Sequence, residues 1–552
     1  MKKLTKIFTV PALLAVLAMG CNTLLDVDSD RLVYPGDHQL NSPNDTIFSM
    51  IGIFTQLEKL ADRYILLGEL RGDLMDVTSN ADPFLQEIND FKITTENPFN
   101  RQEDYYAVIN HCNYLITIID TALTANAEKV MYKEFAAAKA IRAWTYMQAA
   151  LNYGTVQYYT EPVLYVNKEV ETAEYTLDAL VPELIDDLAP WTDVDLPGGI
   201  SLGADLSSDV LFFPVRMVLG ELYLWNGDYE KAAGEFYALI QEETYTIDDF
   251  FQSLWEVDNG VFVSREPENQ GWPYIFTLTN YEQITLIAGS AEFGEGAYLD
   301  SITWFDPEII PSSAAIDTWN DQTYYHTASV QRPGDLRGDM GSYLSPESSP
   351  VIETNDIMDV DRTMNQITKF TTMATDISRA VPVYRVAMLY LRYAEAVNRA
   401  GKPNLAFAVL KHGMSSSTLA VDSIVPRNEK YLAYTDTTGV FYDYVFFEDL
   451  AFNNNIGVHA LGCGNVELST EFKIPSLPGL QDSILFVEEK IIEELALETA
   501  FEGNRFHDLM RIAARRNDPS FLADRVAEKH ADNKEAVRSI LMDESNWYLP
   551  MK

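Results

Sequence analysis

The sequence predicts a mainly α-helical protein, a scaffold of tetratricopeptide-like helix pairs with long irregular loop insertions and a few short strands. Apolar residues recur at helical spacing in four separate blocks of the 552-residue chain. In two of these blocks a glycine lies between two helical patterns and stands five residues before an alanine, Gly227 before Ala232 and Gly401 before Ala406. The blocks recur without a fixed period, so we expect helix pairs separated by insertions and not an uninterrupted solenoid.

The first block predicts two helices, over residues 105–123 and 132–154. In the second of these, Ile141 and Trp144 belong to an apolar stripe with spacings of three and four residues, which is typical of a helix that buries one face. Gly154 ends the pattern, as glycine commonly ends a helix.

The second block, residues 215–240, follows the spacing of the tetratricopeptide consensus, which folds as two antiparallel helices. Gly220 and Ala232 are small enough to let the two helices approach, while Tyr223 and Phe236 fill the space between them. The proline expected after the second helix is absent, so we predict one imperfect repeat here.

Two further blocks, residues 389–413 and 485–516, each predict a helix pair around a glycine. We therefore expect an N-terminal helical region over residues 21–248, a loop insertion over 249–380 and a C-terminal helical region over 381–552, all within one compact unit.

The insertion is rich in glycine, serine, aspartate, asparagine and aromatic residues. Within it, residues 260–266 and 274–280 have the alternating pattern of short strands. Connections of this length are usually functional, so we expect binding to occur here more than in the helices.

Residues 1–20 have the features of a secretory signal, because three lysines precede an apolar run that is too short to span a bilayer. Cys21 follows Ala-Met-Gly, and the segment resembles a bacterial lipoprotein signal, in which this cysteine is acylated and anchors the chain. The alternative is a soluble secreted protein in which Cys21 is incidental. No other segment offers about 18 consecutive apolar residues, so we expect a tethered chain and not a membrane-spanning one.

The chain is strongly acidic, with 83 acidic residues, 40 basic residues and a net charge of −43. Nucleic acid is therefore a poor partner, because a phosphate backbone needs a basic surface. A hydrophobic content of 47% and an aromatic content of 12% exclude a disordered acidic tail. After Cys21 only Cys112 and Cys463 remain, which is no disulfide framework. Whether these two pair is left open, and two buried thiols are expected.

The glycine turn of the fourth block crowds an acid, a base and a cation together. Glu502, Arg505, His507 and Asp508 surround Gly503, where one helix must end and the next begin. Polar residues here are placed to bind the exposed backbone groups of both helix ends. We therefore predict that Glu502, Arg505 and Asp508 form a mostly buried structural network, with His507 as a neighbour and not a general base. The motifs HExxH and GxSxG and a phosphate loop are absent, and no enzyme is expected.

The chain resembles the SusD/RagB family, and the features that carry this resemblance extend over almost its whole length. Two motifs are specific in combination, one around Arg142 and Trp144 and one running from Glu502 through Gly503 to Arg505. The matching segments are Cys21 with the sequence LLDVDSD that follows its signal, and residues 136–163, 389–410, 498–511 and 546–550.

The resemblance implies a lipid-anchored, non-enzymatic protein of the outer membrane that faces the cell exterior. In this family such a protein caps a TonB-dependent, SusC-like transporter and captures an oligosaccharide, or less often a peptide, before import. The implied fold is a helical tetratricopeptide scaffold with an irregular side that contacts the ligand, which agrees with the four blocks described above.

Carbohydrate binding needs flat aromatic faces for the sugar ring and planar polar side chains for its hydroxyl groups. The insertion supplies aromatic residues, and an early loop over residues 71–84 supplies polar ones. For each aromatic residue, packing in the core is the competing interpretation. The candidate glycan contacts are Asp73, Asp76, Asn80, Trp272, Tyr274, Trp304, Trp319 and Tyr324.

The sequence leaves two questions open, the binding of calcium and the class of ligand. Residues 26–30 begin like a calcium loop, but Arg31 stands where an EF-hand needs glycine and Asp37 where it needs glutamate. We expect a linker there, no cofactor and no assigned metal site, although calcium could bind elsewhere. The alternatives to glycan capture are peptide or glycopeptide capture, a secreted glycosidase, and a scaffold that binds only proteins.

Overall fold

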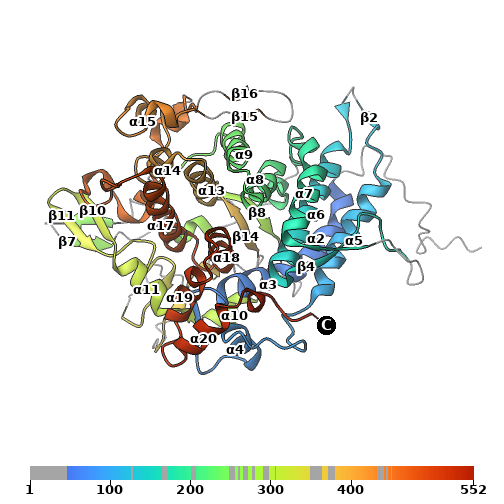
Figure 1. Cartoon of the computed structure of the whole chain (residues 1–552), viewed down its shortest axis with the longest axis horizontal. Helices are drawn as coiled ribbons and strands as arrows, with labels where there is room; N and C mark the ends of the chain where they lie inside the picture. Colours follow the sequence, from blue (N-terminus) through green and yellow to red (C-terminus); the bar gives the residue numbers. More distant parts are fainter. Residues whose placement is uncertain are drawn as a thin grey trace, which may run out of the picture.

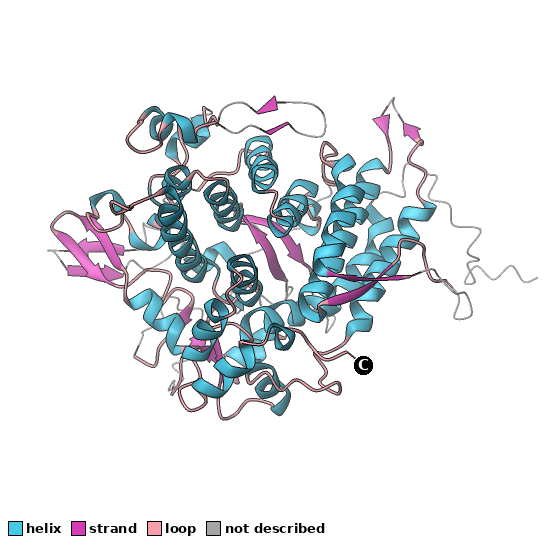
Figure 2. Ribbon diagram, viewed as in Figure 1, coloured by secondary structure: helices cyan, strands magenta, loops and turns pink. Residues whose placement is uncertain are grey.

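Helices dominate the computed structural model of the protein, and its strands are short (Figure 2). Residues 1–46, which include the expected leader, Cys21 and the acidic segment after it, lie outside the described residues. Within the described part of the chain, no helix is both long and apolar enough to cross a membrane. The structure describes residues 47–125, 128–164, 172–199, 207–247, 255–258, 261–264, 272–276, 280–289, 298–304, 306–347, 363–370, 380–431, 434–435, 441–442, 445–448 and 450–551.

All four predicted helix pairs are present, so the predicted fold class is confirmed (Figure 1). The pairs are α5 (Gln102–Ile118) with α6 (Tyr132–Tyr153), α8 (Val215–Asn226) with α9 (Tyr229–Glu242), α13 (Val386–Arg399) with α14 (Pro403–Lys411), and α17 (Leu480–Thr499) with α18 (Arg505–Arg516).

Helices from different pairs also pack against one another and form a continuous row. Its successive neighbours are α5, α6, α7 (Leu177–Leu188), α8, α9 and α13, and both α14 and α17 pack against α13. Long insertions separate the pairs in sequence, yet the chain returns each time to extend the same row (Figure 1). The row therefore forms one scaffold on which the remaining segments are mounted.

The tetratricopeptide spacing of the second block has the expected physical cause. A Cβ atom on Gly220 would lie 2.4 Å from the ring of Phe236, so only glycine lets α8 and α9 come this close. Gly227 ends α8 with a φ angle of 87°, in the left-handed region that favours glycine.

Shorter helices and paired strands complete the described structure. The remaining α-helices are α2 (Ile51–Leu57), α3 (Ala61–Ile65), α4 (Pro83–Asn89), α10 (Leu299–Thr303), α11 (Ser313–Asn320), α15 (Ser416–Ala420), α16 (Ala460–Cys463), α19 (Ser520–Glu528) and α20 (Lys534–Leu541). The antiparallel strand pairs are β1 (Met75–Val77) with β9 (Ile309–Pro311), β2 (Thr124–Ala125) with β3 (Glu128–Lys129), β4 (Thr155–Tyr158) with β5 (Ala173–Thr176), β6 (Trp255–Asp258) with β7 (Val261–Ser264), β8 (Gln283–Ile287) with β14 (Val381–Arg385), β10 (Thr323–Thr327) with β11 (Val330–Pro333), β12 (Tyr343–Leu344) with β13 (Gln366–Ile367), and β15 (Tyr434–Thr435) with β16 (Phe441–Tyr442).

The described parts of the insertion contain short helices and paired strands. The strand expected over residues 260–266 is present as β7, which pairs with β6. The strand expected over residues 274–280 is wrong in its described part, because Trp272–Phe276 form a 3-10 helix. Pro273 favours this outcome, since its fixed φ angle suits the first turn of a helix and its missing N–H weakens a strand.

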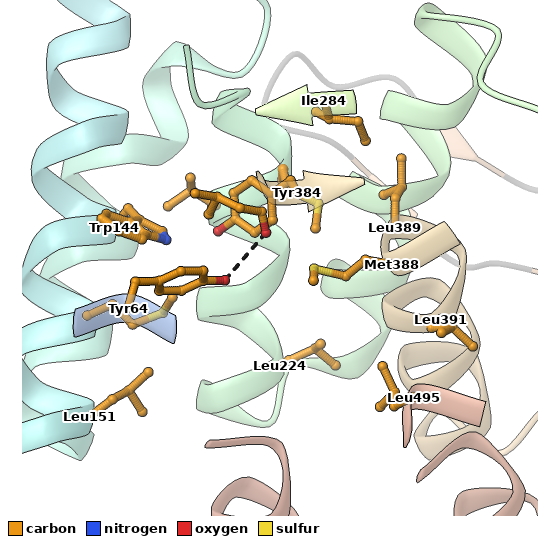
Figure 3. Packing of buried hydrophobic residues seen from close by; sticks show 14 of the residues in the cluster. Tyr64, Trp144, Leu151, Leu224, Ile284, Tyr384, Met388, Leu389, Leu391 and Leu495 are labelled. Carbon is orange, nitrogen blue, oxygen red and sulfur yellow. Dashed lines mark hydrogen bonds between the residues drawn. The ribbon is translucent and has the colours of Figure 1, made fainter. Parts of the chain in front are cut away.

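The pair β8 and β14 brings the insertion into the main core. Tyr384 on β14 lies close to Tyr64 and Trp144 (Figure 3). The rings of Tyr64 and Trp144 are 5.7 Å apart, and the Tyr64 hydroxyl donates a hydrogen bond of 3.4 Å to the carbonyl of Val383. Arg142, two residues before Trp144 on α6, donates to Asp187 over 2.7 Å. Arg142 and Trp144 are thus both buried packing residues of α6.

Candidate functional site

The turn between α17 and α18, which contains Gly503, is buried in the protein. Arg505 at this turn pairs with a carboxylate that is distant in sequence. Arg505 donates two parallel hydrogen bonds to Asp73, of 2.6 Å from Nε and 2.8 Å from Nη2, and a third of 2.9 Å to the carbonyl of Ile492. Burial would raise the pKa of Asp73, but the Arg505 guanidinium holds it below its usual value. Asp73 is therefore a buried counter-ion of Arg505 and does not present its carboxylate at the surface for a glycan.

Glu502 belongs to a second buried cluster. Its carboxylate accepts hydrogen bonds of 2.8 Å from Nε of Arg385 and 2.6 Å from Nζ of Lys369. Arg385 also pairs with Glu498 over 3.1 Å. Burial would raise the pKa of Glu502, but the two cations lower it below its usual value. The cluster ties the insertion and β14 to the end of α17.

Asp508 lies in a third buried cluster, within 2.7 Å of Arg392 and 3.0 Å of Arg511. The three residues predicted to form one network are buried as expected, but each has its own partners. His507 is buried beside Arg71, with 3.2 Å between its Nε2 and the Arg71 guanidinium. Burial first, and then the neighbouring arginine, lower the pKa of His507 well below its usual value.

The backbone groups at the start of α18 are bound by a residue that the sequence analysis did not name. Glu69 accepts hydrogen bonds from the backbone N–H groups of Phe501, Gly503, Asn504 and Arg505, at 2.8 to 3.1 Å. The Asn504 side chain makes no capping hydrogen bond to the start of α18 and instead donates to the carbonyl of Glu502 over 3.2 Å, so the expectation that residues 504–508 bind exposed backbone groups holds for that carbonyl and not for the N–H groups of α18. A carboxylate at a helix N-terminus satisfies the unpaired N–H groups and the helix dipole together.

Two glycines let Glu69 reach this position. A Cβ atom on Gly68 would lie 1.8 Å from the carbonyl oxygen of Gly503, so the two backbones come into direct contact. Gly503 also has a φ angle of 91°, which other residues rarely adopt. The glycine of the crowded turn thus serves backbone packing and not chemistry.

Most of the predicted aromatic platforms are buried. Trp272 is only 2% exposed and donates a hydrogen bond of 3.0 Å to the Ser342 hydroxyl. Trp319 is only 1% exposed and donates one of 3.1 Å to the carbonyl of Leu497. The insertion needs a core of its own to attach to the helical row, and these rings supply it.

The other aromatic candidates give no exposed platform either. Tyr324 is buried, with its ring against Gly464, and Trp304 is buried at the end of α10. Burial favours the competing packing interpretation for Trp272, Trp304, Trp319 and Tyr324, and none of the four presents an exposed ring to a glycan. The Tyr274 side chain lies outside the described residues.

The early loop, in contrast, meets a mid-chain loop at the surface. Strand β1 runs antiparallel to β9, with Asp76 opposite Ile310, so the residues after β1 lie beside those before β9. The backbone N–H of Thr78 donates to the carbonyl of Glu308 over 2.8 Å. The Asn80 side chain donates to Asp306 over 2.8 Å.

We call this region the loop-pair surface. Asn80, Asp82 and Asp306 are exposed there, and the ring of Phe84 is 37% exposed. The sequence did not predict the contributions of Phe84, Asp306 and Glu308. Of these, only the exposure of Phe84 could have been predicted, because Phe84 directly precedes the buried helical positions of α4 and so faces away from the core. The loop-pair surface consists of Asp76, Asn80, Asp82, Phe84, Asp306 and Glu308.

This surface combines the two elements that sugar recognition requires. The exposed Phe84 ring can stack against a sugar ring, and the amide and carboxylate side chains of the same surface can donate to and accept from hydroxyl groups. Asp82 caps α4 by accepting from the backbone N–H of Phe84 over 2.8 Å, which fixes the start of this helix. The Asp82 N–H donates to Glu308 over 2.7 Å, so both loops are held together.

Neither a metal centre nor a disulfide is found among the described residues. No group of three or more His, Cys, Asp or Glu side chains in that part of the chain could hold a metal ion, so the calcium expectation has no location. Cys112 and Cys463 are both buried and unpaired with each other.

Comparison with known proteins identifies the architecture. No protein-family model and no curated protein sequence matches the chain. Among solved structures, surface glycan-binding protein A from Bacteroides uniformis aligns with a TM-score of 0.56 and 16% identity over 92% of this chain and 96% of that one. A SusD superfamily protein from Bacteroides thetaiotaomicron aligns with a TM-score of 0.55 and 16% identity over 93% and 95% of the two chains.

A SusD-like carbohydrate binding protein from Bacteroides fragilis gives a similar result. It aligns with a TM-score of 0.54 and 15% identity over 86% of this chain and 87% of that one. The likeness in each case covers nearly the whole of both chains. The protein therefore has a SusD-like fold, as the sequence resemblance implied.

Proposed function

We propose that the protein is a lipid-anchored binding protein of the outer membrane, which captures an oligosaccharide or polysaccharide at the cell exterior. In this proposal Cys21 carries the lipid, and the captured glycan passes to a SusC-like TonB-dependent transporter. The protein performs no catalysis and uses no cofactor. The observation that carries the proposal is a SusD-like fold shared along almost its entire length with a surface glycan-binding protein and a carbohydrate binding protein.

The residues of the loop-pair surface also support the proposal. Its exposed residues include an aromatic ring, an amide and carboxylates, and they come from two loops. Asn80 and Phe84 are the contacts that this arrangement favours, because both are exposed while their backbones are fixed by β1 and α4. The buried ionic clusters around α18 support a structural function for the motif that first suggested catalysis.

Affinity electrophoresis of the chain without residues 1–21, in gels that each contain one polysaccharide, tests the proposal. We expect retardation in at least one gel, with no release of reducing ends from that polysaccharide. Binding of peptides with no glycan bound would overturn glycan capture in favour of peptide capture. Turnover abolished by one carboxylate substitution would overturn the non-enzymatic function.

The membrane part of the proposal has separate tests. A Cys21→Ala variant should lose membrane association, and a protease added to intact cells should cleave the wild-type protein. Purification of the wild-type protein from detergent-solubilised outer membranes should recover a TonB-dependent transporter. Protection from protease in intact cells would contradict the external orientation.

A further inference from the structure

A cavity of about 880 Å³ is lined in part by the C-terminal residues and by none of the residues of the loop-pair surface. Its wall combines the end of α6, the start of α7, the end of α8, the α18 helix and residues 544–551. A volume of this size suits a ligand of one or a few rings. Trp225, Met510 and Tyr548 supply apolar and aromatic surface to the wall.

Arg71 lines this cavity and carries a buried charge without an acidic partner. It donates to the carbonyl of Leu67 over 2.7 Å and of Trp547 over 2.9 Å, and to the side-chain oxygen of Asn152. Its other neighbours are the Phe506 ring, whose centre lies 4.4 Å from the guanidinium carbon, and His507, whose lowered pKa keeps it neutral. Among the described residues, no carboxylate pairs with Arg71. A buried charge without a counter-ion is costly, so an anion in the cavity would offset that cost.

Arg515 is a second cation of the cavity wall, and none of the described carboxylates forms an ion pair with it. Its guanidinium stacks 4.6 Å from the ring centre of Tyr229 and donates to the hydroxyl of that tyrosine. Its Nη2 atom is buried and has no hydrogen-bond partner within the described residues. Arg511 lines the same cavity but differs, because it is paired with Glu395 over 2.6 Å and with Asp508. Arg515 thus has an unused donor next to the cavity.

Tyr153 adds an unused hydroxyl. Its ring is buried in the cavity wall, and its oxygen is buried without a hydrogen-bond partner in the described structure. Unsatisfied buried polar groups are rare in folded proteins and point to an absent partner. Two acids, Asp178 and Glu544, also line the cavity, but both are exposed and therefore solvated. The buried part of the wall is cationic and rich in donors.

We propose that this cavity binds a sugar unit that carries a carboxylate, as in a hexuronate. The carboxylate compensates the charges of Arg71 and Arg515, and the ring lies against Trp225 and Tyr548. The assignment to a sugar rests on the proposed function, whereas the requirement for an anion rests on the cavity alone. The overall charge of −43 opposes long-range attraction of anions, so binding depends on these local contacts and not on steering.

D-glucuronate and D-glucose are matched probes, because they share a ring and differ in a carboxylate against a hydroxymethyl group. Ligand-observed NMR titration of the chain without residues 1–21 should give an affinity for glucuronate at least about tenfold above that for glucose, since charge-assisted hydrogen bonds contribute about 1.5–3 kcal/mol. Equal affinities, or no binding of glucuronate, would overturn the proposal.

Two variants test whether the preference for glucuronate arises in this cavity. Arg515→Gln should abolish the preference for glucuronate, and Tyr153→Phe should reduce it without loss of stability, since it removes only a hydroxyl that has no partner. Arg538→Gln is the control, because Arg538 pairs with Asp524 at the surface and does not line the cavity. Unchanged glucuronate binding in both cavity variants would refute this site. Loss of polysaccharide binding in loop-pair variants, with the glucuronate preference intact, would separate this inference from the proposed function.

Discussion

Removal of the Arg505 side chain should destabilise the protein without affecting ligand capture. In Arg505→Ala the carboxylate of Asp73 loses both hydrogen bonds, of 2.6 and 2.8 Å, and remains buried as an uncompensated charge. Loss of one partner from a buried ion pair costs about 3–5 kcal/mol. The carbonyl of Ile492 loses a donor at the same time.

The expected shift in melting temperature follows from the size of the chain. An unfolding entropy of about 2.1 cal/mol/K per residue gives about 1.2 kcal/mol/K for this chain, so the loss corresponds to a decrease of about 3–4 °C. Calorimetry and urea unfolding at pH 7 measure it. The matched control is Arg538→Ala, whose surface pair with Asp524 should contribute no more than about 1 kcal/mol.

A double substitution separates charge from packing. If the uncompensated charge dominates, adding Asp73→Asn to Arg505→Ala should recover part of the lost stability, and the two effects should differ from additivity by about 1 kcal/mol or more. An Arg505→Ala protein that melts at the wild-type temperature but no longer binds glycan would refute the structural assignment and make Arg505 a ligand residue.

Three further predictions follow from buried groups. Burial raises the pKa of Glu69 to about 7, so its proton stabilises the fold fully below about pH 4.5, and this contribution is lost as pH rises through 7. The free energy of unfolding of the wild type minus that of Glu69→Gln should therefore fall from pH 5 to pH 8. A constant difference over this range would contradict the raised pKa of Glu69. Burial raises the pKa of Cys112 to about 12, and a thiol reagent at pH 8 should modify Cys112 and Cys463 only after denaturation; two reactive thiols in the native protein would count against their burial. Trp319→Ala should cost about 3–5 kcal/mol in urea unfolding yet leave glycan affinity unchanged, and the reverse result would restore Trp319 as a platform.

The sequence predicts the helical scaffold well because the residues that pack within each helix pair are close to one another in the sequence. Gly220 and Phe236 are close in sequence, and the spacing between them already contains the packing of α8 against α9. The burial of Glu502, Arg505 and Asp508 was also predictable, since a glycine between two helical patterns implies a tight turn in the interior.

The partners of these residues could not be predicted, because they come from distant parts of the chain. Asp73 and Glu69 bind the start of α18 across more than 430 residues of sequence. A polar residue in an early loop looks the same in sequence whether it meets solvent or a buried arginine. Trp319 shows the same limit, because an aromatic residue in an insertion can stack on a ligand or form the core that holds the insertion.

The loop-pair surface arises from strand register, which short strands do not reveal. Only the pairing of β1 with β9 brings Asp306 to Asn80. Phe84 lies within the early loop over residues 71–84, but its exposure depends on where α4 begins. Asp82 and Pro83 fix the start of this helix.

Isothermal titration calorimetry tests the central claim most directly, with an oligosaccharide cut from a polysaccharide that retards the protein in affinity electrophoresis. The doubly substituted protein Asn80→Ala/Phe84→Ala should bind at least about tenfold more weakly than wild type, because a ring contact and an oriented amide are lost together. The matched control is Asn226→Ala/Phe446→Ala, which removes an exposed amide that donates to Asp228 and an exposed ring elsewhere on the surface. Equal affinity of all three proteins would contradict glycan capture at the loop-pair surface.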